Sequence, residues 1–346
     1  MRIDSRVGSV LALVLVALAP FGCAKVEETA SPVSDVQPLY DYPLDTELRL
    51  DHVQTKSTHN SYHVEPPQND LLAWDYTNLP LDRQFEELGV RHIELDLHLE
   101  GGVFNVFHLK LIDDHTTCAS LVECLTAVKT WSDAHRGHHP IVVQLELKDE
   151  STGAQEAFFD ELHREILSVW PLHRIVTPAF VKGTHASIAE ALKEGWPTLG
   201  LTRGKVLFTM DEHAELQRAY THDHKDLEGR LLFPDSEAGD PFAAIMVAND
   251  PIGDALRIAK GLAAHMLVRT RADSDGVEAA ADDVTTRDAA LAVGAHFVST
   301  DYPAARDSTS YVVTIPGGMP SRCNPVTAPN NCTPKHIENP SQLLTP

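Results

Sequence analysis

The stretch Arg91-His92-Ile93-Glu94-Leu95-Asp96-Leu97-His98-Leu99 alternates between polar and apolar residues. Successive side chains of a β-strand point to opposite faces, so Glu94, Asp96 and His98 share one face and the aliphatic residues share the other. Two carboxylates on one face repel each other unless a cation or a proton lies between them. The pattern therefore predicts either the solvated edge strand of an antiparallel sheet or a barrel strand whose polar row faces a mouth that holds charge.

Helix-like and strand-like segments alternate on both sides of this stretch. The expected strands are 48–58, 91–99, 103–109, 141–147, 205–210, 242–247, 265–270 and 297–301, and the expected helices are 81–88, 119–135, 155–169, 188–193 and 279–293. Such alternation is typical of a parallel sheet, and this number of strands in one unit favours a TIM (β/α)8 barrel. Because no glycine-rich phosphate loop follows the first strand, a dinucleotide-binding fold is disfavoured.

Composition excludes several classes of protein. The 346 residues are 43% hydrophobic, which allows a sizeable core, and carry a formal net charge of -22. Nucleic-acid binding needs basic patches, so we expect no nucleic-acid partner. An acidic surface suits an exported protein and cation binding.

The N-terminus resembles an export signal. Arg2 and Arg6 precede the apolar run 10–19, which is too short to span a bilayer, and Gly22-Cys23 follows. We expect a signal peptide over 1–22 and a lipidated Cys23 at the outer surface or in the periplasm, with simple secretion as the alternative. A tether over 23–47, a catalytic barrel over 48–305 and a Pro/Thr-rich segment over 306–346 complete the predicted organisation.

The remaining cysteines form two close pairs in the sequence. Oxidising conditions outside the cytoplasm favour disulfides, and of the three possible pairings the two local ones, Cys118–Cys124 and Cys323–Cys332, are preferred. A zinc site is disfavoured because neither pair has C-x-x-C spacing.

Polar residues gather where the expected strands end, which is where barrel enzymes build their active sites. They are His59, Asn60, Glu94, Asp96, His108, Glu146, Lys148, Arg269, Arg271 and Asp301. Four of them, Asn60, Glu94, Asp96 and Glu146, offer only oxygen ligands, which suit a hard cation such as Ca²⁺. The two histidines His59 and His108 could then serve as general base and general acid.

Several of these segments, in this order, resemble a known family. Thr58–Tyr62 (THNSY), Ile93–Asp96 (IELD), Val106–His108 (VFH) and Leu145-Glu146 are similar to the X-box of phosphoinositide-specific phospholipase C. Arg269–Asp273 (RTRAD) and Val298–Pro303 (VSTDYP) resemble its bacterial calcium-dependent branch. The resemblance covers Leu48 to Pro303 and implies a distorted TIM barrel of the phospholipase C-like phosphodiesterase type.

The resemblance also implies a reaction. In that family the inositol 2-hydroxyl attacks phosphorus, a cyclic inositol phosphate forms and diacylglycerol leaves. By motif position His59 acts as base or stabilises the phosphorane, His108 protonates the leaving alkoxide, and Asn60, Glu94, Asp96 and Glu146 hold Ca²⁺. Lys148, Arg269, Arg271 and Asp301 are expected at the substrate, although the arginines could instead pair with Asp273 and Asp301.

The sequence departs from the eukaryotic enzymes near Lys205–Asp211, where their lysines bind ring phosphates and this chain has Phe208, Thr209 and Met210. We therefore expect unphosphorylated phosphatidylinositol or a soluble glycerophosphodiester as substrate. We also expect a monomer that meets the membrane surface transiently or through a lipid anchor.

Two alternatives remain open from the sequence. One is a glycerophosphodiester phosphodiesterase that uses water, although that family has His-Arg-Gly where this chain has His59-Asn60-Ser61. The other is a lipoprotein that binds inositol phosphates or sugars without turnover. It is disfavoured because both histidines and all four oxygen ligands are present.

Overall fold

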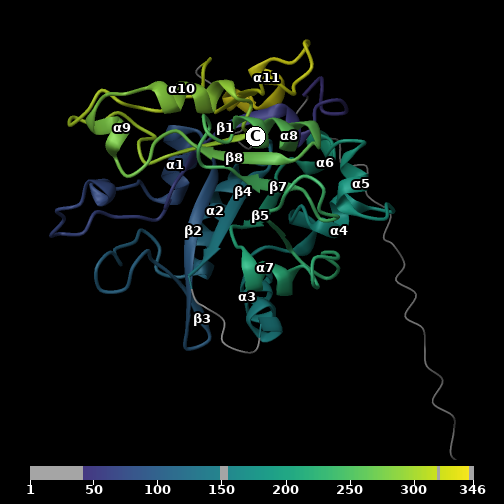
Figure 1. The fold of residues 1–346 in the computed structure, drawn as a ribbon, viewed down its shortest axis with the longest axis horizontal. Coiled ribbons are helices and arrows are strands. Elements are labelled where there is room, and N and C mark those ends of the chain that lie inside the picture. Colours follow the sequence, from purple (N-terminus) through teal and green to yellow (C-terminus); the bar gives the residue numbers. More distant parts are fainter. Residues whose placement is uncertain (1–41, 149–154, 318–319, 343–346) are drawn as a thin grey trace, which may run out of the picture. The chain divides into compact units, whose positions relative to one another are not determined.

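The computed structural model describes residues 42–148, 155–317 and 320–342. The predicted signal peptide, Cys23 and the tether up to residue 41 lie outside these residues. Within them, strands pair in the order β6-β5-β4-β2-β1-β9-β8-β7, and all pairs on this path are parallel. Figure 1 labels β1, β2, β4, β5, β7 and β8 of this path. These strands are β1 (Val53–Thr58), β2 (Val90–Glu100), β4 (Ile141–Leu147), β5 (Val206–Met210), β6 (Leu232–Pro234), β7 (Ile245–Val247), β8 (Leu267–Arg271) and β9 (Phe297–Thr300).

The two outer strands of this order meet and nearly close a barrel. A single parallel bridge joins Asp235, just after β6, to Ile245 in β7. The backbone N–H of Ser236 donates to the carbonyl of Ile245 at 3.0 Å, and the N–H of Val247 donates to the Asp235 carboxylate at 2.7 Å. The predicted TIM barrel of parallel strands is therefore confirmed.

Helices follow most strands and cover the outside of the barrel. They are α1 (Leu81–Leu88), α2 (Leu121–Ala134), α3 (Gln155–Val169), α4 (Pro178–Lys182), α5 (Ile188–Leu192), α6 (Leu199–Thr202), α7 (Ala214–Tyr220), α8 (Ala255–Ala263), α9 (Val277–Ala280), α10 (Thr285–Ala292) and α11 (Pro334–Ile337). None of the helices in the described part of the chain has the length and apolar composition to cross a bilayer.

Strand β2 lies inside the sheet, so the edge-strand interpretation of its alternation is wrong. It pairs with β1 on one side and β4 on the other. Ile93, Leu95 and Leu97 are completely buried in the main hydrophobic core. Glu94 and Asp96 are equally inaccessible, at 2% and 0% exposed. The polar row of this strand therefore faces the barrel interior and ends at its mouth.

Several of the predicted elements differ from those in the structure. The short strand β6 and the helix α8 were not predicted, and the strand expected over 242–247 is confined to β7. The helix expected over 279–293 is divided into α9 and α10. It breaks at Asp282, which has a positive φ of 49° and whose carboxylate accepts hydrogen bonds from Thr309 and Ser310. Aspartate often competes in this way with helical hydrogen bonding.

Two strands stand outside the barrel path. β3 (Val103–Val106) forms a hairpin with β2, which extends beyond the neighbouring strands in Figure 1. β10 (Ser321–Cys323) pairs antiparallel with the first half of β1. Both predicted local disulfides, Cys118–Cys124 and Cys323–Cys332, are present.

A buried ion pair attaches the last described segment to the barrel. Glu338, directly after α11, accepts hydrogen bonds from the Nε of Arg91 at 2.9 and 3.1 Å. Burial raises the pKa of the Glu338 carboxyl, but Arg91 and His139 outweigh this effect and hold the pKa at about 2. Arg91 is 1% exposed, so the Glu338 carboxylate compensates a charge that water cannot reach.

Candidate active site

Three carboxylates meet where β2 and β4 end at the barrel mouth. Asp96 and Glu146 are register partners on these neighbouring strands, and Glu94 stands opposite Gln144. Glu94, Asp96 and Glu146 each offer an oxygen within 4.8 Å of the others. The alternation read from the sequence explains this placement, because parallel strands bring equivalent positions side by side.

Asp96 has the surroundings of a cation ligand. Both of its carboxylate oxygens are buried and lack a hydrogen-bond partner among the described residues. The Lys148 ammonium forms an ion pair with Asp96 Oδ2 at 3.0 Å and also pairs with Glu146. Burial, and then the negative charge of Glu146, raise the pKa of Asp96 well above its usual value despite Lys148. A buried carboxylate beside two further carboxylates fits a Ca²⁺ ion, which prefers oxygen ligands.

Glu94 is instead held by Arg269 from β8. The Arg269 Nη2 donates to Glu94 Oε2 at 2.6 Å, and both side chains are almost inaccessible. Arg269 also donates to Asn249 and to the Ser299 hydroxyl. Burial raises the pKa of Glu94, but the opposing effect of Arg269 and other nearby positive groups is larger. The net pKa of Glu94 is therefore below its ordinary value. Glu94 is therefore an ionised carboxylate next to Asp96.

A tight turn after β1 places the predicted His59 and Asn60. Asn60 has a positive φ of 38°, a conformation that asparagine tolerates better than most residues. Its carbonyl accepts hydrogen bonds from the His63 N–H and the Asn78 side chain. The backbone N–H of the next residue, Ser61, donates to the carbonyl of Glu94, and the Ser61 hydroxyl accepts a hydrogen bond from the Glu94 N–H. This turn is thereby fixed beside the carboxylate group.

His59 is oriented by Asp301, which follows β9. The His59 Nδ1–H donates to Asp301 Oδ1 at 2.7 Å, while Arg271 donates to the other oxygen at 2.9 Å. Burial raises the pKa of Asp301, but His59 and Arg271 outweigh it and lower the pKa to about 2. The second ring nitrogen of His59 remains on the partly exposed side, 3.4 Å from Arg271 Nη1.

His108 forms a second histidine–aspartate pair, whose aspartate was not predicted. The His108 Nδ1–H donates to Asp113 Oδ2 at 2.8 Å, and the buried His63 lies 2.9 Å from Oδ1 of the same carboxylate. Burial raises the pKa of Asp113, whereas its hydrogen bonds with His108 and His63 bring it down to about 2. The sequence offered one signal, an acidic residue five positions after His108.

Tyr76 shows that both pairs and the carboxylates share one mouth. Its hydroxyl is buried, and burial followed by the charge of Asp301 raises its pKa well above the ordinary value. Asp113 and Asp96 add to this effect, and Arg271 opposes it. The Tyr76 side chain thus lies within reach of the charges of the His59–Asp301 pair, the His108–Asp113 pair and Asp96.

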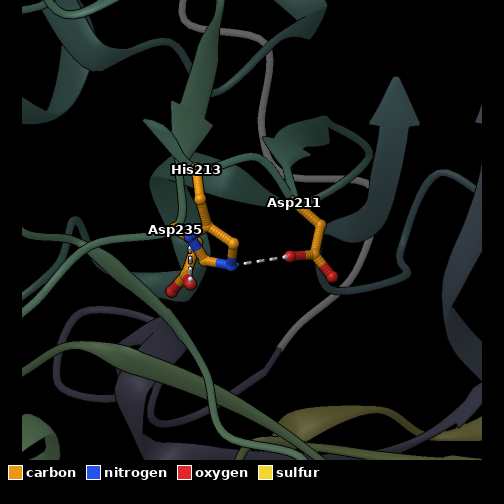
Figure 2. A group of neighbouring side chains, drawn as sticks. All are labelled: Asp211, His213 and Asp235. Carbon is orange, nitrogen blue, oxygen red and sulfur yellow. Dashed lines mark ion pairs between the residues drawn. The ribbon is translucent and has the colours of Figure 1, made fainter. Parts of the chain in front are cut away.

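A further group of titratable residues lies where β5 and β6 end (Figure 2). The exposed His213 ring stands between two carboxylates, with Nδ1 3.6 Å from Asp235 and Nε2 4.0 Å from Asp211. Burial raises the pKa of Asp211 to about 7, and the negative charges of Glu94 and Asp235 add to this against Arg269. This part of the mouth therefore combines two acidic side chains with one exposed histidine.

Comparisons with known proteins identify a matching family and solved structures with a similar fold. A family model described as phosphoinositide phospholipase C, Ca²⁺-dependent, matches residues 98–325. The calcium-dependent phosphatidylinositol-specific phospholipase C of Streptomyces antibioticus superposes with a TM-score of 0.55 at 19% identity, covering 74% of this chain and 95% of that one. The apo form of a calcium-dependent enzyme from a Gram-negative Pseudomonas species gives 0.55 at 19% identity, covering 83% and 99%. None of the curated proteins searched matches the sequence.

Proposed function

This chain belongs to the calcium-dependent phosphoinositide phospholipase C family, and we propose that it cleaves phosphatidylinositol or a related glycerophosphoinositol with the inositol 2-hydroxyl as nucleophile. The observation that carries the proposal is the pairing of two partly exposed histidines with buried, ionised aspartates at one barrel mouth. Each pair holds a ring by Nδ1 and leaves Nε2 for the substrate, as acid–base catalysis requires.

The two histidines have opposite tasks in the proposed reaction. Nε2 of His59 takes the proton of the 2-hydroxyl while the new O–P bond forms, and Asp301 stabilises the resulting imidazolium. His108 gives a proton to the glycerol oxygen as its P–O bond breaks, and Asp113 orients its ring. The products are a cyclic inositol phosphate and diacylglycerol from phosphatidylinositol, or glycerol from a glycerophosphoinositol.

Asn60, Glu94, Asp96 and Glu146 are the residues that we propose as holding the calcium ion. The buried Asp96 carboxylate, whose Oδ1 has no hydrogen-bond partner among the described residues, supports this assignment. When bound, the ion supplies a hard positive charge that acidifies the attacking hydroxyl and offsets the charge of the phosphate. Lys148 already contacts two of these carboxylates, so we assign it to balancing their charge rather than to direct substrate contact.

The cations from β8 divide between the two sides of the mouth. Arg269 neutralises Glu94, and Arg271 neutralises Asp301 while its Nη1 reaches toward His59. Arg271 therefore lies where it would meet the phosphate oxygens that develop charge beside His59. Asp211 and Asp235 favour a headgroup without further ring phosphates, because such phosphates would meet negative charge.

The loop that follows His108 supports a lipid substrate. Leu111 and Ile112 are 86% and 63% exposed, and Leu111 has a positive φ of 69°, which is unusual for a bulky residue. Leu71 and Leu72 are also exposed, and neighbouring Trp74 packs edge-on against the His108 ring at 6.2 Å. We call Leu71, Leu72, Leu111 and Ile112 the apolar rim. We propose that the apolar rim inserts into the lipid surface and so brings the barrel mouth to its substrate.

The test is ³¹P NMR of the protein with phosphatidylinositol vesicles in Ca²⁺ and in excess chelator. A cyclic inositol phosphate that forms only with Ca²⁺ is the expected result. A product that forms equally in chelator contradicts the calcium assignment, and the absence of turnover in both conditions contradicts the reaction.

A further inference from the structure

One buried lysine of the barrel wall lacks a counter-ion. Ser57 points into the barrel, where its hydroxyl lies 2.6 Å from His92, whereas the preceding Lys56 lines a pocket with residues of α1 and α2. Lys56 is 5% exposed, and its ammonium donates to the carbonyl of Pro303 at 2.8 Å. Within residues 42–148, 155–317 and 320–342, no carboxylate forms an ion pair with it.

The charge of this lysine persists despite burial. Burial lowers the pKa of Lys56 to about 8, and no charged neighbour contributes to the change. The side chain is therefore mostly protonated at neutral pH. A buried ammonium with one carbonyl contact is costly, and a counter-ion that reached it would recover part of that cost.

Lys56 lines a pocket of about 550 Å³ on the outer side of the barrel. The pocket walls include Phe85 and Leu88 from α1, Trp131 from α2 and Ile315 from the segment after β9. Its other lining cation, Arg91, is bound to Glu338, and the lining Glu86 accepts the indole N–H of Trp131. Among the described lining residues, Lys56 is thus a cation left without an anionic partner next to apolar walls.

We propose that this pocket binds a small monocarboxylate with an apolar body, its carboxylate on the Lys56 ammonium and its chain against Phe85, Leu88 and Trp131. The volume falls in the usual range of small-molecule sites. One ammonium matches one negative charge, whereas a phosphate monoester would bring an uncompensated second charge near Glu86 and Glu87. This site is separate from the barrel mouth and does not depend on the proposed reaction.

Isothermal titration calorimetry at neutral pH with sodium octanoate tests the proposal. We expect octanoate to bind the unaltered protein and to bind Lys56→Met about 10-fold or more weakly, while uncharged 1-octanol does not distinguish the two proteins. Lys205→Met is the matched control, because Lys205 also donates to a backbone carbonyl and lies near an aromatic ring, Phe180, outside this pocket. It should bind octanoate as the unaltered protein does.

A second variant keeps the lysine and fills the pocket. Ala304→Phe adds a ring to the pocket wall and should reduce octanoate binding with Lys56 intact. Thermal unfolding of each variant reports whether the fold is retained. Equal affinity of octanoate for the unaltered protein and for Lys56→Met, unchanged affinity in Ala304→Phe, or no binding to the unaltered protein up to about 10 mM overturns the proposal.

Discussion

Nδ1 of His59 lies 2.7 Å from Oδ1 of Asp301, although 242 positions separate the two residues in the sequence. The barrel brings them together because β1 and β9 are neighbouring parallel strands whose ends coincide at the mouth. With a pKa of about 2, Asp301 is ionised throughout the pH range in which a histidine can act as a base. This hydrogen bond fixes the orientation of the His59 ring and places an ionised carboxylate next to its Nδ1.

Replacing Asp301 by asparagine should therefore lower kcat for phosphatidylinositol by about 10²- to 10⁴-fold, because the imidazolium of His59 loses its counter-charge. The measurement is initial rate at saturating substrate, with thermal unfolding to confirm the fold. His222→Ala is the matched control, since His222 pairs with Asp226 at 2.7 Å on the surface. An equal loss of kcat in Asp301→Asn and His222→Ala would contradict a catalytic role for the His59–Asp301 pair.

The acid role of His108 predicts a dependence on the leaving group. His108→Ala should slow cleavage of phosphatidylinositol by about 10²- to 10⁴-fold, since the glycerol alkoxide then leaves unprotonated. A nitrophenyl inositol phosphodiester has an acidic leaving group that needs no proton, so the loss should be far smaller. His59→Ala should be impaired with both substrates. A similar loss of both activities in His108→Ala would argue against general acid catalysis.

The cluster of Glu94, Asp96 and Glu146 and the cluster of Asp211, His213 and Asp235 should differ in their preference for metal ions. Asp96→Asn should weaken Ca²⁺ binding, measured directly by calorimetry, by about 10-fold or more, because it removes a charged ligand of the oxygen-only group. Asp235→Asn should leave Ca²⁺ affinity nearly unchanged, since that group includes the nitrogen donor His213, which Ca²⁺ disfavours. The reverse order of effects would place the ion in the second group.

The apolar rim predicts a split between lipid and soluble substrates. The double substitution Leu111→Ser and Ile112→Ser removes exposed apolar surface and should lower activity on phosphatidylinositol vesicles several-fold, together with vesicle binding by sedimentation. Activity on a water-soluble inositol phosphodiester should stay unchanged. Val326→Ser, at another exposed apolar side chain, is the control. Unaltered vesicle binding in the double variant would contradict this role.

Glu338 predicts a dependence of stability on pH. Its pKa is about 2 in the folded protein and 4.5 ordinarily, so the stabilisation is complete above pH 4.5 and is lost as pH falls toward 2. At about 1.4 kcal/mol per pH unit, this interval corresponds to about 3 kcal/mol. Glu338→Gln should therefore be less stable than the unaltered protein by about that amount at pH 7, and the gap should narrow below pH 4.5. Glu87 forms an exposed pair with Arg83, so Glu87→Gln should change the free energy of unfolding little. If the difference in unfolding free energy between Glu338→Gln and the unaltered protein did not depend on pH, titration of Glu338 could not be its source.

Long periodic segments were predictable from the sequence, and short ones were not. The polar–apolar alternation of β2 extends over 11 residues, and the apolar stripe of α2 belongs to a helix of 14 residues. Both elements are present in the structure. β6 has three residues including Pro234, which carry no periodicity of their own. Its existence depends on pairing with Phe208–Met210 of β5, a tertiary contact that local sequence does not encode.

The same distinction applies to the candidate site. Motif residues such as His59, Glu94 and His108 were identifiable because their types and order are characteristic. Asp113 was not, since its two partners lie 5 and 50 positions away and its role emerges only when the His63 and His108 loops pack together. The counter-charges that Arg269 and Arg271 supply to Glu94 and Asp301 required the closed barrel, although the second pairing was among the sequence alternatives.

The pairing of β10 with β1 has a consequence for the order of folding. The Ser321 hydroxyl donates to Thr55 across 266 positions of sequence, and the buried charge of Arg91 awaits Glu338 from the same late segment. Contacts so distant along the chain impose a high loop-closure entropy and slow folding. The first strand and the Arg91 guanidinium therefore stay without these partners until residues 321–338 are available, so the N-terminal half of the barrel cannot mature on its own.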